Sequence, residues 1–330
     1  MKALLCKAYG PPETLVLEEL PSPTPGPGQV KIRVRACGVN FPDLLIIENK
    51  YQEHPDLPFA PGAEVAGDVI EVGPGVTDVA VGDRVIGMLD WGGYQEETLC
   101  DAARCLPIPD SMDYDIAASF TLTYGTSYHA LVDRARLSAG ETLLVLGASG
   151  GVGTAAVDIG RCLGAHIIAA GGNDEKLARI AGIYGVDDLI NYTTLEEPLK
   201  DRVNALSGGK GADVIYDPIG GEAFQQSLRC VNWEGRILVV GFASDGENLP
   251  QARTNLLLLK GSALIGVFWG RFTYENPKKN RENMSKLFDM FSAGELSPHI
   301  SHRLPLAQGA DAMYALANRE VVGKCVIVME

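Results

Sequence analysis

A glycine-rich turn carries the clearest chemical signal in this sequence. The apolar run Leu143–Leu146 leads into the small residues Ala148-Ser-Gly-Gly-Val-Gly153, and a helical pattern follows over residues 154–164. Small residues let the backbone turn sharply and approach a pyrophosphate, and a helix N-terminus offers free N–H groups and a positive dipole end. Ala148 stands where the G-x-G-x-x-G pattern has its first glycine. The turn therefore predicts a dinucleotide site.

The elements around this turn predict the sheet that must position it. Short apolar segments alternate with helical patterns along the following chain, which indicates a parallel sheet covered on both faces. We expect a doubly wound α/β domain. Its further strands are expected at residues 166–170, 188–192, 212–217, 235–241 and 262–268, and helices at 173–181, 199–206 and 222–229.

The end of the second predicted strand indicates which dinucleotide is bound. An NAD site usually has an acidic residue about 20 residues after the glycine turn, to hold the ribose 2′-hydroxyl. Here the strand ends in Gly171-Gly-Asn173, which leaves room for a 2′-phosphate, and Lys176 and Tyr192 are its expected contacts. Asp174 and Glu175 can instead face solvent or cap the next helix. The pattern favours NADPH over NADH.

Composition restricts the class of protein. A chain of 330 residues with 46% apolar residues can bury two domain cores. Its net charge of −14 and lack of basic runs argue against nucleic-acid binding. No apolar stretch approaches the length of about 18 residues that a membrane helix needs. Seven scattered cysteines without a C-x-x-C pair indicate reduced thiols in the cytoplasm.

The two ends of the chain predict a second domain of a different kind. Residues 30–36, 65–72 and 83–88 read as short strands among Gly-Pro and Gly-Asp turns, which is typical of a mostly antiparallel β domain. Residues 281–291 have a helical pattern, and the strand at 324–329 resembles the N-terminal strands. We therefore expect this domain to be discontinuous.

Several motifs together resemble the zinc-free quinone oxidoreductase branch of the medium-chain dehydrogenases/reductases, which includes zeta-crystallin. They are Gly38-Val-Asn-Phe-Pro-Asp43, Pro61-Gly-Ala-Glu-Val-Ala-Gly67, Val81-Gly-Asp-Arg-Val85, the glycine turn and Ile190-Asn-Tyr192. The resemblance implies a GroES-like catalytic domain (1–125 and about 271–330), a Rossmann domain (126–270) and a cleft where nicotinamide meets substrate. It also suggests a homodimer formed through the last Rossmann strand.

The resemblance locates the zinc ligands of related enzymes, and this chain lacks them. The matching positions are Asn40 and Ala63, and residues 119–125 contain neither Cys nor His. A zinc site needs three protein ligands, so we expect no metal. Metal-free hydride transfer suits an acceptor that is already electrophilic, such as a quinone or an α,β-unsaturated carbonyl. Asn40 and Tyr51 are the expected hydrogen-bond donors to the oxyanion, and Asp43 is expected to orient them.

The resemblance also assigns cofactor contacts, position by position. They are Phe41, Thr126, Ser149, Gly150, Gly151, Val152, Gly171, Asn173, Lys176, Tyr192, Pro218, Gly241, Phe242, Ala243, Phe268, Trp269, Gly270 and Lys324. Phe268 and Trp269 can equally be core or subunit-interface aromatics. Two alternatives to a quinone or enone reductase remain. One is a 2-enoyl-CoA reductase, whose CoA phosphates Arg271, Lys278 and Lys279 would hold, and the other is a non-catalytic NADPH-binding protein.

Overall fold

The chain folds into two units, and each unit has its own β-sheet and core. The computed structural model describes residues 1–244 and 249–329. Unit 1 contains Met1–Thr121 and His299–Glu330, and unit 2 contains Leu122–Pro298. Within the described residues, no helix has the length and apolar character that crossing a bilayer requires.

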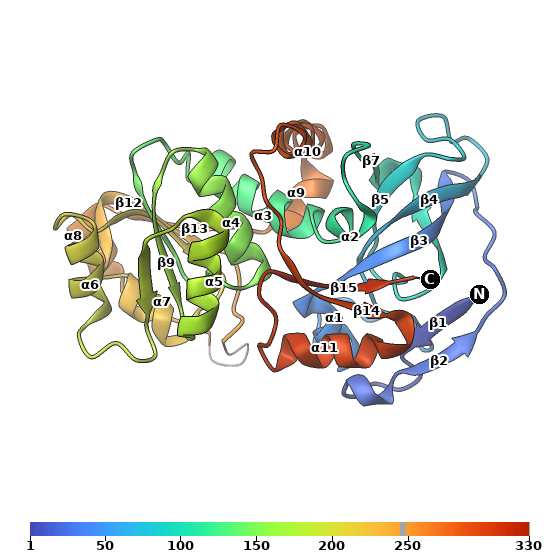
Figure 1. Cartoon of the computed structure of the whole chain (residues 1–330), viewed down its shortest axis with the longest axis horizontal. Helices are drawn as coiled ribbons and strands as arrows, with labels where there is room; N and C mark the ends of the chain where they lie inside the picture. Colours follow the sequence, from blue (N-terminus) through green and yellow to red (C-terminus); the bar gives the residue numbers. More distant parts are fainter. Residues whose placement is uncertain (245–248, 330) are drawn as a thin grey trace. The chain divides into compact units, whose positions relative to one another are not determined.

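Unit 1 is built on a seven-stranded sheet to which both ends of the sequence contribute. The strand order is β14-β15-β3-β4-β5-β7, and β6 also pairs with β3. β15 lies antiparallel to β3 and parallel to β14, so the last strand is an interior one, as the red and blue strands of Figure 1 show. The sheet strands are β3 (Gln29–Val39), β4 (Glu64–Val72), β5 (Arg84–Met88), β6 (Glu97–Asp101), β7 (Cys105–Pro107), β14 (Ile300–Pro305) and β15 (Lys324–Val328).

Short elements complete unit 1. A separate antiparallel pair consists of β1 (Lys2–Leu5) and β2 (Val16–Glu19). The helices are α1 (Phe41–Ile47), α2 (Tyr114–Ala117) and α11 (Gly309–Ala317), with single 3₁₀ turns at Pro12–Thr14, Ala102–Arg104 and Leu306–Gln308. The core combines alternate residues of β3, such as Val30, Ile32 and Val34, with apolar residues of α1 and α11. The predicted mostly antiparallel, discontinuous β domain is confirmed.

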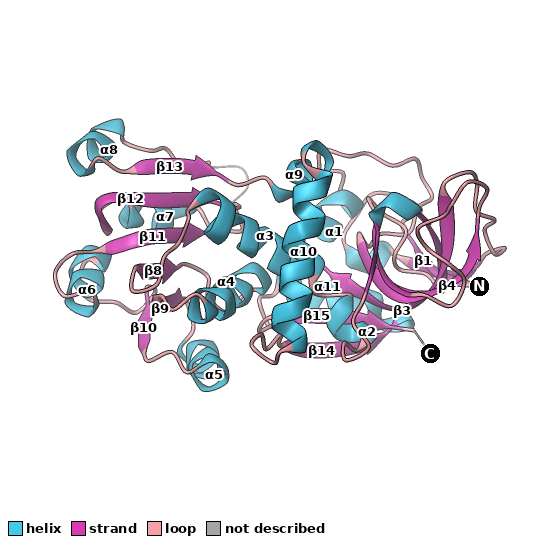
Figure 2. Ribbon diagram, turned by 90° about the horizontal axis from the view of Figure 1, so that it is seen from above, coloured by secondary structure: helices cyan, strands magenta, loops and turns pink. Residues whose placement is uncertain are grey.

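Unit 2 contains the predicted doubly wound sheet. Six strands pair only in parallel, in the order β10-β9-β8-β11-β12-β13, which Figure 2 shows from one edge to the other. Strand order reverses between β8 and β11, and open α/β sheets bind ligands at the carboxyl ends of strands at such a point. The strands are β8 (Thr142–Val145), β9 (His166–Gly171), β10 (Asp188–Asn191), β11 (Ala212–Asp217), β12 (Val231–Val239) and β13 (Ala263–Gly266).

Helices cover both faces of this sheet, because alternate residues of its strands are apolar on both sides. Leu144 and Leu146 belong to a core with α6, α7 and α8, whereas Leu143 faces Gly160 of α4. The helices of unit 2 are α3 (Thr126–Tyr128), α4 (Gly151–Cys162), α5 (Asp174–Tyr184), α6 (Leu199–Leu206), α7 (Gly221–Ser227), α8 (Thr254–Lys260), α9 (Trp269–Glu275) and α10 (Pro277–Ser292), and the π-helical segments are η3 (Thr121–Gly125) and η4 (His129–Arg134).

The segment 271–298 differs from its expected place in the catalytic domain, since its contacts lie in unit 2. Phe272 of α9 stacks on His129, with ring centroids 3.8 Å apart. Asn283 of α10 donates a hydrogen bond to Asp133 at 2.7 Å. Met284 and Leu287 of the apolar face of α10 are buried, and helical periodicity alone cannot identify the domain on which that face packs.

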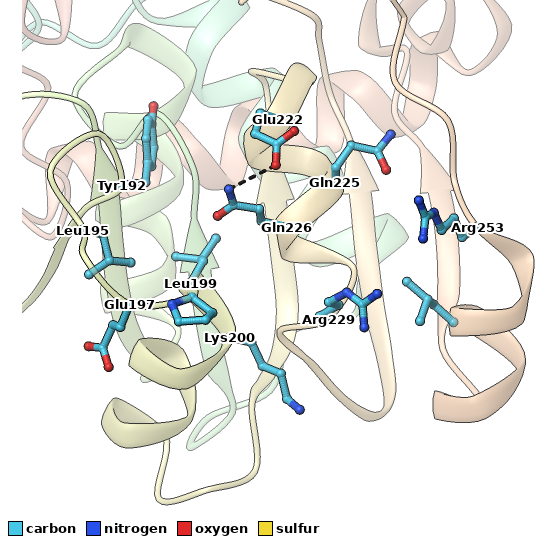
Figure 3. A pocket seen from close by; sticks show the side chains of 12 residues that line it. Tyr192, Leu195, Glu197, Leu199, Lys200, Glu222, Gln225, Gln226, Arg229 and Arg253 are labelled. Carbon is cyan, nitrogen blue, oxygen red and sulfur yellow. Dashed lines mark hydrogen bonds between the residues drawn. The ribbon is translucent and has the colours of Figure 1, made fainter.

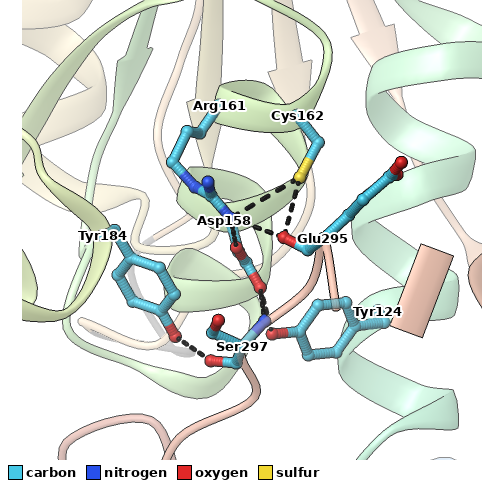
Figure 4. A network of polar contacts seen from close by, with 7 residues as sticks. All are labelled: Tyr124, Asp158, Arg161, Cys162, Tyr184, Glu295 and Ser297. Atoms are coloured by element: carbon cyan, nitrogen blue, oxygen red, sulfur yellow. Dashed lines mark hydrogen bonds and ion pairs between the residues drawn. The ribbon is translucent and has the colours of Figure 1, made fainter. Parts of the chain in front are cut away.

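A buried polar network fixes the chain after α10 to α4 (Figure 4). The carboxylate of Asp158 is fully buried and accepts hydrogen bonds from the Tyr124 hydroxyl at 2.9 Å and the Ser297 N–H at 2.7 Å. Arg161 pairs with the same carboxylate at 3.0 Å and donates to the Glu295 carbonyl. These contacts explain why unit 2 extends as far as Pro298.

Candidate active site

The glycine turn of unit 2 has the geometry that a pyrophosphate requires. α4 begins at Gly151, and its N-cap residue Gly150 supplies no side-chain hydrogen bond to the first turn. A Cβ atom on Gly153 would lie 2.2 Å from the Gly147 carbonyl oxygen, so only glycine permits this approach of helix and strand. The first N–H groups of α4 thus form an open, electropositive cradle that fits an anion.

Thr126 is held beside this cradle by the residue that follows it. The Ser127 hydroxyl donates to the Val152 carbonyl at 2.9 Å and contacts the Tyr216 hydroxyl, also at 2.9 Å. Both contacts are within unit 2, and Thr126 is itself buried. The structure therefore brings together Thr126 and the predicted pyrophosphate residues, Ser149 to Val152.

The four residues predicted to surround a 2′-phosphate also lie together. The Tyr192 N–H donates to the Gly171 carbonyl at 3.1 Å, and a Cβ on Gly172 would be 3.6 Å from the Tyr192 ring. Asn173 is the N-cap of α5 and accepts the Lys176 N–H at 2.9 Å. Because the neighbouring acidic residues, 174 and 175, are exposed in the first turn of α5, no carboxylate occupies the end of β9.

Tyr192 also borders a cavity of about 510 Å³ in unit 2 (Figure 3). The cavity extends along α6, α7 and the start of α8, and its lining mixes cationic, acidic and apolar side chains. Inside the cavity, the Gln226 side-chain amide donates a hydrogen bond to the Glu222 carboxylate at 3.1 Å. The lining residues are Tyr192, Leu195, Glu197, Pro198, Leu199, Lys200, Glu222, Gln225, Gln226, Arg229, Arg253 and Leu256.

The loops after β11 and β12 bring three more predicted contacts together. The Ala243 N–H donates to the Pro218 carbonyl at 3.1 Å, and a Cβ on Gly241 would lie 3.1 Å from the same oxygen. Asp217, at the end of β11, accepts the N–H groups of Ile219 and Gly220 and so fixes this loop. Phe242 beside them is 39% exposed.

Phe268, Trp269 and Gly270 follow β13, and their environments differ. Trp269 is buried against Gly125, where a Cβ would lie 2.7 Å from the indole ring, so it packs in unit 2. Phe268 is 58% exposed, and its ring lies near Gly270. Trp269 is therefore a core residue of unit 2, which is one of the two alternatives, core or subunit interface, that the sequence left open.

The predicted catalytic residues of unit 1 begin helix α1. Asn40 is the N-cap of α1, and its backbone N–H donates to the Asp43 carboxylate at 2.8 Å. Both side chains are buried, and the Tyr94 hydroxyl lies 3.4 Å from the same carboxylate oxygen. Burial is the main reason why the pKa of Asp43 rises from 3.8 to about 7. Phe41, the first residue of α1, is 44% exposed.

The buried position of Lys324 is not explained by its predicted role as a cofactor contact. Its ammonium is buried in unit 1 and donates to the Asn40 side-chain oxygen at 2.5 Å and to the Val39 carbonyl at 3.1 Å. Burial lowers the pKa of Lys324, while the nearby carboxylates of Glu64 and Asp43 oppose this shift. In this structure Lys324 is thus a partner of Asn40 and not an exposed cation.

Two members of this buried cluster were not predicted from the sequence. Glu64 and Tyr94 are both fully buried, and Gly38 leaves room for the Glu64 carboxylate, which would lie 3.2 Å from an added Cβ. An acidic residue beginning the apolar segment Glu64-Val-Ala-Gly67 is the signal that could have identified Glu64.

Tyr51 lies apart from the cluster. It is half-buried against the core of unit 1, and burial raises the pKa of its phenol, which is hydrogen-bonded to Gln52. Among the described residues, no hydrogen bond joins it to Asn40 or Asp43, although the charge of Asp43 is near enough to contribute to the raised pKa of the phenol.

No cluster of three or more His, Cys, Asp or Glu residues suited to a metal occurs in the described ranges, 1–244 and 249–329. Cys100 and Cys105 are buried free thiols.

Comparisons with known proteins agree with both units. The family described as "Alcohol dehydrogenase GroES-like domain" matches residues 26–110, and that described as "Zinc-binding dehydrogenase" matches residues 151–291. Quinone oxidoreductase-like protein 2 homolog from Nematostella vectensis is 39% identical over 99% of this chain and 88% of its own length. The Bos taurus quinone oxidoreductase-like protein 2 is 37% identical over 100% and 93%.

A solved structure agrees as well. The Escherichia coli quinone oxidoreductase complexed with NADPH superimposes with a TM-score of 0.89 at 26% identity, covering 99% of this chain and 100% of that one. The predicted GroES-like and Rossmann combination is therefore confirmed, and the chain belongs to the quinone oxidoreductase branch of the medium-chain dehydrogenase/reductase family.

Proposed function

We propose that this protein is an NADPH-dependent, zinc-independent reductase that transfers a hydride to a quinone or an α,β-unsaturated carbonyl compound. The observation that carries the proposal is the open N-terminus of α4, where Gly153 approaches Gly147 too closely for any side chain. Bound NADPH would supply the hydride. The residues that would hold it are those of the cradle, Thr126, and the loops after β11, β12 and β13.

The preference for NADPH over NADH rests on the end of β9. Asn173 uses its side-chain oxygen to cap α5, so the carboxylate that would hold a ribose 2′-hydroxyl is replaced by a capping amide. Lys176 and Tyr192 are the residues that would contact a 2′-phosphate, since both lie against this end of the strand.

The acceptor class follows from the donors available in unit 1. Asn40 presents an amide where metal-dependent relatives have a zinc ligand, and an amide donates hydrogen bonds without acting as a Lewis acid. Such a donor stabilises the oxyanion that develops on a quinone or enone, because the negative charge of the transferred hydride is delocalised onto the carbonyl oxygen. Asp43 holds Asn40 at the start of α1, and the Tyr51 phenol is the further donor, of a hydrogen bond or a proton.

The experiment follows NADPH and NADH absorbance with 1,4-benzoquinone, a 2-alkenal and acryloyl-CoA, with a metal chelator present throughout. We expect chelator-insensitive consumption of NADPH with the quinone or the alkenal, and a lower but measurable kcat in Asn40→Ala. Faster turnover of the thioester would favour a 2-enoyl-CoA reductase. That alternative needs the basic residues near the C-terminal end of unit 2 to hold the CoA phosphates. Two of them have acidic neighbours, since Arg271 is paired with Glu275 and Lys279 lies 3.8 Å from Asp133. Tight NADPH binding without turnover of any acceptor would favour a binding protein.

A homodimer formed through β13 is part of the proposal. β13 pairs with β12 along one edge only in the described sheet, and large apolar side chains of β13 and of the preceding helix α8 are exposed. Leu258 is 81% exposed, Leu259 70% and Leu264 38%. A second copy could cover them by adding its own β13. Analytical ultracentrifugation tests this: we expect a dimer, and a monomer for Leu264→Asp. A wild-type monomer at micromolar concentration would contradict the dimer and leave the reductase proposal intact.

We place the protein in the cytoplasm, since all seven of its cysteines are free thiols, six of them buried and Cys162 partly buried. Mass spectrometry after thiol labelling of the unfolded protein tests this, because seven labelled thiols are expected from cells lysed with an alkylating reagent.

A further inference from the structure

Lys324 is a buried cation whose position is fixed by its own strand. It begins β15, and its backbone N–H donates to the His299 carbonyl at 3.0 Å. Gly323 before it has φ +68°, and a Cβ there would lie 2.3 Å from the same carbonyl oxygen. The chain therefore enters β15 in one conformation and directs the Lys324 side chain inward, where it is 6% exposed.

A buried ammonium needs compensating acceptors, because removing its charge from water is costly. Lys324 finds two neutral ones, the Asn40 side-chain oxygen and the Val39 carbonyl. Glu64 of β4 and Asp43 of α1 are its carboxylate neighbours. Of these partners, the Asn40 oxygen makes the shorter of the two hydrogen bonds, at 2.5 Å against 3.1 Å for the Val39 carbonyl.

The contact with Lys324 decides which way the Asn40 amide faces. An ammonium group only donates hydrogen bonds, so the atom facing it must be the amide oxygen and not the nitrogen. The nitrogen then faces away, and its one contact among the described residues is a long one of 3.4 Å to the Gly38 carbonyl. A cation on the amide oxygen also polarises the amide, which strengthens its N–H groups as donors.

Asn40 is thus held at two points. Asp43 accepts its backbone N–H, and Lys324 donates to its side-chain oxygen. A donor aimed in advance at a developing charge stabilises that charge without reorganising during the reaction.

We infer that Lys324 is a positioning residue that orients and polarises the Asn40 amide so that its N–H donates to the oxyanion of the electron acceptor. The inference rests on the proposed function, since it assumes that Asn40 is the donor. It replaces the expectation that Lys324 binds a cofactor phosphate.

A double-mutant cycle tests the inference. Lys324→Met keeps most of the apolar stem and removes the donor, and we expect kcat to fall about 10-fold or more, with the Kd of NADPH changed less than about twofold. In the Asn40→Ala background the same change should have no further effect on kcat, because the amide through which Lys324 acts is gone. Lys324→Arg, which retains a donor, should recover part of the loss. Lys7→Met, at an exposed lysine of unit 1, is the control.

Each result distinguishes the two proposals. If Lys324→Met lowers kcat equally with and without Asn40, Lys324 acts on the protein as a whole and the inference is overturned. Weaker NADPH binding with unchanged kcat would also overturn it and restore the phosphate contact. If Asn40→Ala itself leaves kcat unchanged, the proposed role of Asn40 fails instead. Should Lys324→Met unfold, the cycle is carried out with Lys324→Arg and Lys324→Gln.

Discussion

Replacing Asp43 by asparagine should change how the stability of the protein depends on pH. The Asp43 carboxyl is 2% exposed, and burial raises its pKa from 3.8 to about 7, although the Asn40 N–H, Lys324 and Tyr94 all favour the ionised form. Because its pKa is raised on folding, Asp43 binds a proton more tightly in the folded chain than in the unfolded one. Its contribution to stability is therefore fully present at low pH and is lost as pH rises through about 7.

The size of this effect follows from the shift. A rise of about three pKa units corresponds to about 4 kcal/mol of free energy of unfolding, lost in full only above pH 7. Since the unfolded carboxyl is already largely ionised at pH 5, about 2.5 kcal/mol of the loss falls between pH 5 and pH 8. Asparagine at position 43 has no such titration and can still accept the Asn40 N–H.

Urea unfolding at pH 5 and pH 8 measures the difference. We expect the free energy of unfolding of Asp43→Asn, relative to the wild type, to increase by about 2.5 kcal/mol between the two pH values. Asp83→Asn is a matched control, since Asp83 also accepts the N–H of the residue three positions earlier, at 2.8 Å, in an exposed turn. The reasoning would be refuted if the free energy of unfolding of Asp43→Asn differed from that of the wild type by the same amount at pH 5 and pH 8. The buried carboxyl would then not titrate in this range.

Three further substitutions, one of them with a matched control, test unit 2. Gly153→Ala should destabilise it by about 1–3 kcal/mol and weaken NADPH binding in calorimetry, because the added Cβ would lie 2.2 Å from a backbone oxygen. Gly182→Ala, in an open part of α5, should instead be neutral or stabilising, and equal effects of the two would contradict the packing argument. Asn173→Ala should cost about 1 kcal/mol in thermal unfolding through loss of the α5 cap, and no change would show that the cap contributes nothing. Asp158→Ala should cost about 3 kcal/mol or more, since the Tyr124 hydroxyl and a buried N–H lose their acceptor; a cost below about 1 kcal/mol would mean that water replaces it.

The fold was largely predictable because its signals are local. The glycine turn at 148–153 and the alternating strands and helices predicted the parallel sheet, and the period-two pattern of residues 30–36 predicted the β domain. The extent of unit 2 was not predictable in the same way. α10 shows its apolar face in the sequence, but the hydrogen bond from its Asn283 to Asp133 of η4 joins residues 150 positions apart, which helical periodicity cannot report.

The candidate site was predictable only in part, for a related reason. Asn40 and Asp43 are three positions apart in one motif, and the structure joins them by a capping hydrogen bond. Asn40 and Lys324 are 284 positions apart, and only the pairing of β15 with β3 brings them together. Sequence spacing cannot report such a contact, and a lysine beside a glycine in a nucleotide-binding protein suggests a phosphate ligand instead.

The interior position of β15 has a consequence for how the protein is made. Ribosomes synthesise unit 2 in one continuous stretch, so it can fold while residues 324–328 are still to be added. During that interval the β15 side of β3 lacks its partner, and an unpaired strand edge invites chaperones or other nascent chains. The same late strand delivers Lys324 to Asn40. The Asn40 amide, the proposed donor to the acceptor, would then reach its contact with Lys324 only after β15 pairs with β3. Under the proposed function, a chain made only as far as unit 2 would bind NADPH before it could reduce an acceptor.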